Sequence, residues 1–143
     1  MKHTFLLLSI VCAFTFFGCS KKLDEDPLAS LRANLTGHLW KISSTVMVTA
    51  SGEQPQSIPN CKKDNLWEYK TDGSFAVYPG SILCNSSEVT LYGTWELLNN
   101  GKSLKITIPN AGSYTDEVRV LEATKLQLAY TTNNLFIDTY VSN

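Results

Sequence analysis

The sequence predicts an all-β fold, a short eight-stranded antiparallel up-and-down barrel. Apolar and polar residues alternate with a period of two in almost every segment after residue 38, as in strands with one buried face. Gly, Pro, Asn or Asp stands at almost every boundary between these segments, where tight turns form. No connection is long enough for a crossover helix, so we expect neighbouring strands to be antiparallel. A barrel would leave no free sheet edge, and a two-sheet β-sandwich is the alternative.

Residues 1–18 have the features of a secretory signal peptide, and we expect them to be removed. Lys2 precedes an apolar run from Phe5 to Phe17, which is shorter than the roughly 20 apolar residues that a membrane-spanning helix needs. A charged start, a short apolar segment and a small residue at its end are typical of secretion signals. The expected fold therefore begins after this segment.

Cys19 follows the apolar segment and is the predicted lipidation site. The order Phe16-Phe17-Gly18-Cys19 resembles the lipobox of bacterial lipoproteins, in which a diacylglyceryl group is attached to the cysteine sulfur. The resemblance implies an anchor of several acyl chains, such as palmitate, which gives stable membrane attachment. Ser20 in the next position implies an outer-membrane lipoprotein of the cell envelope, on either face of that membrane. Cleavage after Ser20, which would release a soluble protein, is the alternative.

Residues 19–34 are predicted to form a polar tether, and residues 35–143 the barrel domain. The tether ends in Leu28, Leu31 and Leu35, whose spacing is that of one face of a helix. We therefore expect a short helix that plugs or caps the barrel.

The barrel strands follow from the alternation and from the turn residues between them. A loop rich in Gly, Pro and Ser is expected at residues 50–60. Residues 72–73 are expected to form a two-residue hairpin turn, and residues 99–102 (NNGK) are the strongest turn sequence in the chain. The eight predicted strands cover residues 38–49, 65–71, 74–78, 88–98, 103–109, 114–121, 125–131 and 135–141.

The same alternation assigns side chains to the two faces of each strand. Val89 and Leu91 are expected on the inward face of strand 88–98. Asp116 and Glu117 are adjacent, so they point to opposite faces and cannot act on one substrate. Both carboxylates are expected to be solvated.

Cys61 and Cys84 are predicted to form a disulfide. Cys12 lies in the signal peptide and Cys19 is the candidate lipid site, so these two cysteines remain in an exported protein, where oxidising conditions favour pairing. A ring of about 24 residues would stabilise the fold by roughly 3 kcal/mol. A zinc site is the alternative, but two thiolates and His38 do not supply four ligands. We expect no metal and no other cofactor.

An ordered set of short motifs resembles the small bacterial lipocalin-like domains of secreted lipoproteins. The set consists of LTGHLWKI, CKKDN, TDGSF, a second cysteine, GTWEL, LKI and VRVLEATKLQLAY, and it covers about residues 35–130. The resemblance implies a barrel closed at one end by Trp40, with Cys61 paired to Cys84. It also implies a carrier that holds small apolar molecules inside the barrel.

Large inward aromatic residues are the tentative ligand-lining set. An eight-stranded barrel is just wide enough either to hold one small ligand or to be filled by its own side chains, so core packing is the alternative. A ligand site predicts a cavity of roughly 300 Å³ or more. The candidate residues are Trp40, Trp67, Tyr69, Phe75 and Trp95.

Composition and motifs argue against nucleic-acid binding and catalysis. The chain has 12 Lys and Arg against 13 Asp and Glu, with no basic cluster longer than two residues, so no nucleic acid is expected. No serine lies in a G-x-S-x-G or S-x-x-K motif, and we expect His38 to be packed or at the surface. Two functions remain: non-catalytic binding of a small hydrophobic or amphipathic ligand, or a filled barrel that serves as an inhibitor or accessory subunit. In the second case, loops 50–60 and 79–87 would contact the protein partner.

Overall fold

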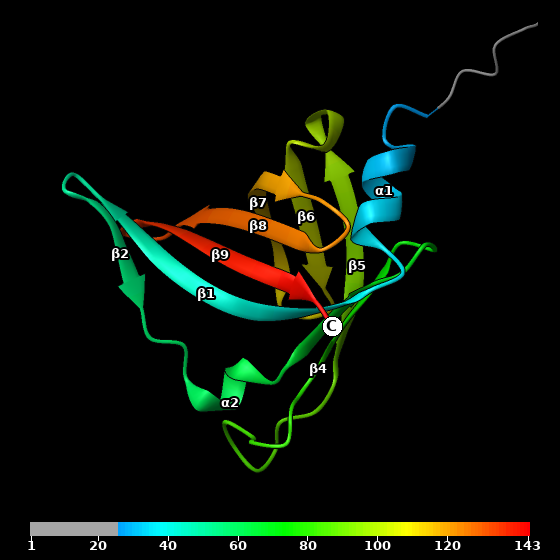
Figure 1. The fold of residues 1–143 in the computed structure, drawn as a ribbon. Helices are drawn as coiled ribbons and strands as arrows, with labels where there is room; N and C mark the ends of the chain where they lie inside the picture. Colours follow the sequence, from blue (N-terminus) through cyan, green and yellow to red (C-terminus); the bar gives the residue numbers. More distant parts are fainter. Residues whose placement is uncertain (1–25) are drawn as a thin grey trace, which may run out of the picture.

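The alternating segments form one continuous antiparallel sheet that closes on itself, in a computed structural model that describes residues 26–143 (Figure 1). The ring contains eight strands, β1 and β3 to β9, which confirms the predicted barrel. The signal peptide and Cys19 lie outside the described residues. The strands are β1 (Leu39–Thr49), β2 (Gly52–Gln56), β3 (Leu66–Tyr69), β4 (Ser74–Tyr78), β5 (Leu91–Leu98), β6 (Ser103–Ile108), β7 (Gly112–Leu121), β8 (Lys125–Thr131) and β9 (Leu135–Ser142).

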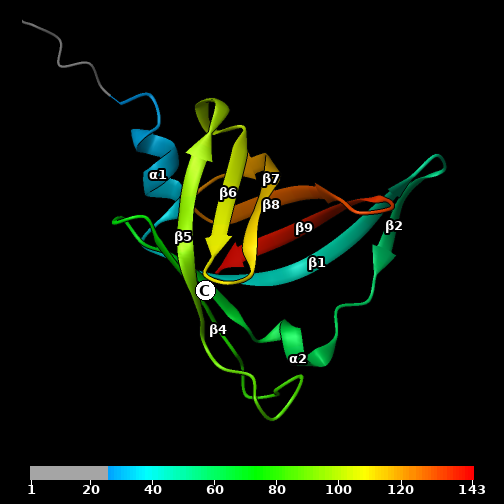
Figure 2. The same ribbon diagram turned by 180° about the vertical axis from the view of Figure 1, so that it is seen from behind.

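The long first strand closes the ring. One edge of β1 pairs with β9 from Trp40 to Val48, and the start of its other edge pairs with β3 at Leu39 and Trp40. The register of β1 shifts between Ile42 and Ser44, a bulge that helps a strand to bend. The curvature of β1 across the barrel is visible in both views (Figures 1 and 2).

A short strand, β2, occupies the middle of the segment that was expected to be the loop 50–60. It pairs only with the second half of β1, from Thr45 to Thr49, outside the closed ring. Pro55 lies within β2, opposite Val46. Proline has no N–H to donate, but an edge strand tolerates this because one of its edges is unpaired. The loop prediction is therefore wrong for Gly52–Gln56.

The expected short helix is α1 (Ala29–Leu35), and it covers one end of the barrel (Figure 2). Leu35 is fully buried in the main hydrophobic cluster, and Leu28 and Leu31 pack against that cluster. Trp40 is also fully buried, and its indole N–H donates to the Leu35 carbonyl at 2.8 Å. This bond satisfies the polar atom of a large buried ring, and it confirms that Trp40 closes the end of the barrel. We call this the α1 end.

The other helices within residues 26–143 are shorter than α1. They are α2 (Asn60–Lys63) and the 3-10 turn η1 (Asn99–Gly101), which forms the predicted NNGK turn with positive φ at all three residues. Within residues 26–143, no helix is long and apolar enough to cross a membrane.

Two local predictions are corrected. Strand β5 begins at Leu91, so Val89 lies in the preceding connection and is 76% exposed; Leu91, at the strand end, is 40% exposed. Neither residue reaches the interior, because the alternating pattern of this segment continues past the point where strand pairing starts. The turn at residues 72–73 is also longer than two residues, since the Lys70 N–H donates to the Ser74 carbonyl around it.

Candidate functional site

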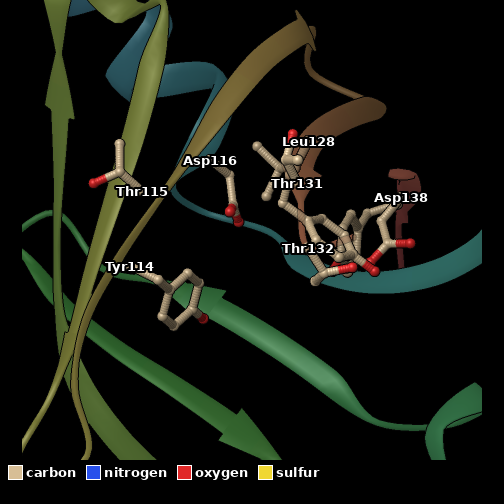
Figure 3. Close-up of a pocket in the computed structure, with 9 residues that line it drawn as sticks. Tyr114, Thr115, Asp116, Leu128, Thr131, Thr132 and Asp138 are labelled. Atoms are coloured by element: carbon tan, nitrogen blue, oxygen red, sulfur yellow. The ribbon is translucent and has the colours of Figure 1, made fainter. Parts of the chain in front are cut away.

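The candidate site is a pocket at the other end of the barrel interior, which we call the open end. Its volume is about 420 Å³. Strands β7, β8 and β9 build its walls, and the β8–β9 turn contributes Thr132. Figure 3 shows Tyr114 and Asp116 projecting from β7 into the space on whose far side Asp138 lies. The main wall residues are Tyr114, Asp116, Leu128, Tyr130, Asp138 and Tyr140.

Strand register brings these side chains to the same face of the sheet. In a strand, every second side chain points inward, so each strand contributes a pair of residues two positions apart. Leu128 of β8 lies opposite Asp138 of β9, and Thr45 of β1 lies on the other side of Asp138. The pocket therefore depends on long-range pairing, and no single segment of the sequence contains it.

Asp116 is the most unusual group in the pocket. The residue is only 9% exposed, and none of the side-chain hydrogen bonds found in residues 26–143 involves its carboxyl. Burial, and secondarily the negative charge of Asp138, raises the pKa of Asp116 to about 6. A nine-tenths buried carboxyl without a partner is costly for the fold, which is typical of functional positions.

Asp138 is held in place better than Asp116. The Thr45 hydroxyl donates to its Oδ1 at 2.6 Å. Burial raises the pKa of Asp138, while the hydroxyls of Thr45, Tyr130 and Tyr140 and the positive charge of Lys62 act in the opposite direction. Lys62 belongs to α2, so α2 brings one positive charge toward this side of the pocket.

Tyrosine hydroxyls surround the two carboxyls. Burial is the main cause that raises the pKa of Tyr69 and Tyr140 well above the usual value, and nearby Asp116 contributes to both shifts. Burial, with the charge of Asp116, raises the pKa of Tyr114 to about 12, although Tyr114 lies at the rim and is 45% exposed. These phenols are therefore neutral near pH 7 and can donate or accept hydrogen bonds.

The prediction that Asp116 is solvated is wrong, whereas that for Glu117 is confirmed. Glu117 is exposed and its Oε2 lies 2.9 Å from Arg119 Nη2 on the outer face of β7. The two neighbours do point to opposite faces, as expected. The alternation Tyr114, Asp116, Val118 contained the information that Asp116 points inward, but the prediction did not decide which of the two neighbouring carboxylates faces the interior.

The five aromatic residues predicted to line a ligand site lie in or beside the packed core. Trp40, Tyr69, Phe75 and Trp95 are buried members of the main cluster, and half-buried Trp67 packs against it. The ring of Tyr69 lies 5.1 Å from that of Phe75, centroid to centroid. None of the five is among the residues that line the pocket. The structure thus brings them together, but as packing partners.

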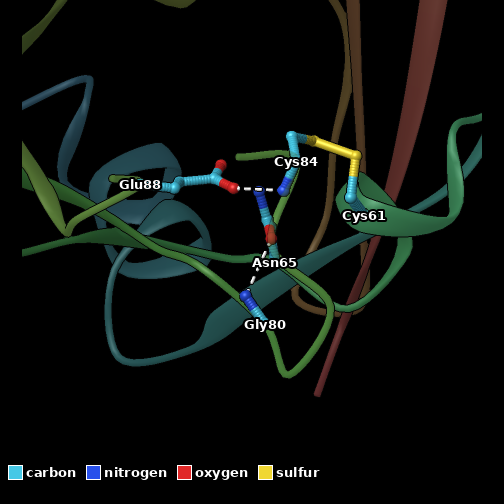
Figure 4. Close-up of a disulfide and its surroundings, with 5 residues drawn as sticks. All are labelled: Cys61, Asn65, Gly80, Cys84 and Glu88. Carbon is cyan, nitrogen blue, oxygen red and sulfur yellow. Dashed lines mark hydrogen bonds between the residues drawn. A yellow bond between two sulfur atoms is a disulfide. The ribbon is translucent and has the colours of Figure 1, made fainter. Parts of the chain in front are cut away.

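The predicted disulfide is confirmed, and it joins α2 to the β4–β5 connection. Cys61 and Cys84 are linked with a Cα–Cα distance of 5.0 Å. Two hydrogen bonds hold the same region (Figure 4): Glu88 Oε2 accepts from the Cys84 N–H at 2.7 Å, and Asn65 Oδ1 accepts from the Gly80 N–H at 2.9 Å. Loop 79–87 is therefore fastened to the segment that follows loop 50–60.

His38 and possible metal ligands complete the set of predicted features. His38 lies beside Trp40, with ring centroids 5.7 Å apart in an edge-on arrangement, and it does not line the pocket. Among residues 26–143, no group of three or more His, Cys, Asp and Glu side chains is placed to hold a metal ion.

The barrel is similar to solved structures from two Bacteroides species. A lipocalin-like protein from Bacteroides uniformis ATCC 8492 has a TM-score of 0.57 and 17% identity, over 77% of this chain and 99% of that one. An uncharacterized protein from Bacteroides eggerthii DSM 20697 has a TM-score of 0.53 and 15% identity, over 74% and 98%. At these identities the similarity establishes the fold alone, and the fold is lipocalin-like. No protein-family model and no curated protein sequence matches the chain.

Proposed function

We propose that this protein is a non-catalytic binding protein that holds one small amphipathic molecule in the pocket at the open end. The observation that carries the proposal is Asp116, a nine-tenths buried residue whose carboxyl faces a pocket of about 420 Å³ and has no hydrogen-bond partner among residues 26–143. Pockets of roughly 300 to 1,000 Å³ with a few convergent polar groups are typical of small-molecule sites. The lipocalin-like fold is compatible with this role.

The lining favours an amphipathic ligand over a purely apolar one. Leu128 is buried and gives the wall an apolar surface. Tyr130 lines the pocket and stacks on Phe136 with ring centroids 5.6 Å apart, so the pocket also offers an aromatic surface. The carboxyls of Asp116 and Asp138 require hydrogen-bond donors. A molecule with one apolar part and one polar part would satisfy both kinds of wall.

Native mass spectrometry of the protein comprising residues 20–143, which contains every described element, tests the proposal. We expect a noncovalent adduct of a few hundred daltons, either as purified or after incubation with lipid and metabolite extracts. Thr131→Trp should abolish the adduct because Thr131 lines the pocket. Lys102→Trp adds the same indole at an exposed turn and should leave the adduct unchanged. A bare mass under all conditions would contradict ligand binding.

The site of action in this proposal is the cell envelope. Support comes from the lipobox-like sequence that ends in Cys19, through which acyl chains would tether the barrel to the outer membrane. Intact-mass analysis of the protein from a membrane fraction tests this: a mass increase that maps to Cys19 is expected. An unmodified amino terminus at Ser20 or beyond would contradict the anchor.

Protein recognition is a second candidate function, favoured by exposed apolar residues that follow one another closely in the sequence around Cys84. Five exposed large hydrophobic residues lie between positions 82 and 92: Ile82, Leu83, Val89, Leu91 and Tyr92. Clustered exposed apolar residues are typical of interaction sites. Crosslinking of the membrane-bound protein should capture a stoichiometric partner, and Val89→Ser with Tyr92→Ser should remove it. Capture that is equal with the double variant would contradict this candidate.

A further inference from the structure

We infer that the polar group of the ligand is an organic ammonium cation, bound between Asp116 and Asp138 among the tyrosines of the open end. The inference rests on the proposed function, because it specifies the chemistry of the same pocket. It depends on three features: the charge of the pocket, the groups around that charge, and the apolar walls beside it.

The charge of the pocket is negative on two sides. Asp116 enters from β7 and Asp138 from β9 (Figure 3), and the charge of Asp138 is close enough to raise the pKa of Asp116. The basic side chain that opposes them is Lys62, which acts on Asp138. Asp116 is nine-tenths buried, and its carboxyl has no hydrogen-bond partner in the described part of the chain. A cation in the pocket would pair with Asp116 and reduce its repulsion with Asp138.

The tyrosines supply the second feature that an ammonium group requires. Tyr114, Tyr130 and Tyr140 all line the pocket. Their phenolic oxygens can accept ammonium hydrogens, and the faces of their rings attract cations. Charge-assisted hydrogen bonds to a carboxylate are about twice as strong as neutral ones. An ammonium group could therefore pair with both carboxyls and with the tyrosines around them.

The apolar walls define the rest of the ligand. Leu128 and Tyr130 line the pocket together with the carboxyls, and Phe136 stacks on the Tyr130 ring. The volume of about 420 Å³ accommodates one ring and a short chain more readily than a long acyl chain. An arylalkylammonium ion fits these limits. A carboxylate ligand would instead meet two negative charges, and a neutral alcohol would leave one of them unpaired.

Isothermal titration calorimetry on residues 20–143 at pH 7.5 tests the inference with three matched probes: 2-phenylethylammonium, 2-phenylethanol and 3-phenylpropionate. We expect the ammonium ion to bind about tenfold more tightly than the alcohol, and the carboxylate to bind more weakly than both. Asp116→Asn and Asp138→Asn should each lower the ammonium affinity about tenfold. Glu117→Gln is the matched control, because this carboxyl is next to Asp116 but lies on the outer face, and it should change nothing.

Other titration results would contradict either the recognition of positive charge or ligand binding itself. If the alcohol binds as tightly as the ammonium ion, recognition of positive charge is wrong while ligand binding in the pocket stands. The same holds if Asp116→Asn lowers affinity no more than Glu117→Gln does. If none of the three probes binds, and native mass spectrometry with extracts also shows no adduct, both the inference and the proposed function are wrong.

Discussion

The α1 end and the open end of the barrel are built from the same strands, but they differ in whether their buried polar atoms have hydrogen-bond partners. At the α1 end, the indole N–H of Trp40 is paired with the Leu35 carbonyl, and apolar residues fill the space around it. At the open end, Asp116 is nearly as buried, but its carboxyl has no hydrogen-bond partner within the described residues, and it lines a pocket. Satisfied polar groups stabilise a core, whereas unsatisfied ones cost stability and are available to a ligand.

Single strands contribute to both ends. Val118 and Leu121 of β7 pack against the core, while Tyr114 and Asp116 earlier in the strand line the pocket. The packed part of each strand holds the pocket residues in register, since one β-sheet positions both. We therefore expect changes at the α1 end to affect stability most and changes at the open end to affect binding most.

The largest expected effect is at the α1 end. Trp40→Ala should lower the free energy of unfolding by about 3 to 5 kcal/mol, because it leaves a cavity and an unpaired Leu35 carbonyl. Urea unfolding of residues 20–143 measures this. Tyr92→Ala is the control, since Tyr92 is 64% exposed, and it should cost less than about 0.5 kcal/mol. A loss below about 1 kcal/mol for Trp40→Ala would reject the packed-end description.

The disulfide near the open end should have the next largest effect. Replacing both Cys61 and Cys84 with Ser should lower the free energy of unfolding by about 2 to 5 kcal/mol, since the crosslink restricts the unfolded chain. Thermal unfolding without reductant compares the double variant with the parent. Equal melting temperatures would show that the bond does not contribute to stability.

A smaller effect is expected where η1 meets α1. A methyl group at Gly101 would lie 2.3 Å from Leu31 Cδ1, and the residue has a φ of +83°. Gly112 has a φ of +97° with nothing within 4 Å of the added carbon. Gly101→Ala should therefore cost about 1 to 2 kcal/mol, more than Gly112→Ala, which adds backbone strain alone. If urea unfolding gives the same loss of stability for Gly101→Ala and Gly112→Ala, then α1 does not pack tightly against this turn.

The smallest expected effect is a gain in stability at the open end. The pKa of Asp116 is raised to about 6. The folded state therefore holds the carboxyl proton more strongly than the unfolded state between about pH 4 and pH 6, and stability falls as pH rises through that range. Asp116→Asn removes the cost of ionising this buried carboxyl. We expect a gain of about 1 kcal/mol at pH 7.5, reduced by water in the open pocket, and almost none at pH 4.

Urea unfolding at the two pH values measures this gain, with Glu117→Gln as the control that should show none. The titratable groups that face Asp116 also bear on the result: Tyr69, Tyr114, Tyr130, Asp138 and Tyr140. A variant that is less stable than the parent at pH 7.5 would show that Asp116 has a stabilising partner.

Alternation and turn residues predict antiparallel strands, because period-two patterning and tight turns act locally along the chain, and the absence of free edges favours the barrel over a sandwich. The resemblance to lipocalin-like domains gave the role of Trp40, and the two cysteines left in an exported protein gave the disulfide. Reasoning from alternation and turns missed β2, since Pro55 argues against a strand unless the strand is known to lie at an edge. It also extended the inward face to Val89 and Leu91, whose exposure depends on where pairing with β4 begins.

The pocket was the part that sequence reasoning could not assemble. Its residues come from three strands and a turn, and their meeting depends on strand register, which is a long-range property. The large aromatic rings were better candidates by type, but their size made them fill the core. Asp116 was considered only as a pair with Glu117 and was expected to be solvated, although its place in the alternation was that of an inward residue. At functional sites, local preferences and the final structure often disagree.

We propose that the open end binds a ligand while the α1 end remains packed. Backbone amide chemical-shift mapping during titration with 2-phenylethylammonium distinguishes the two ends. We expect shifts centred on residues 114–116, 128–132 and 138–140, and none around Leu35 and Trp40. Shifts centred on the α1 end or on loop 79–87, or no shifts at saturating probe, would contradict this proposal.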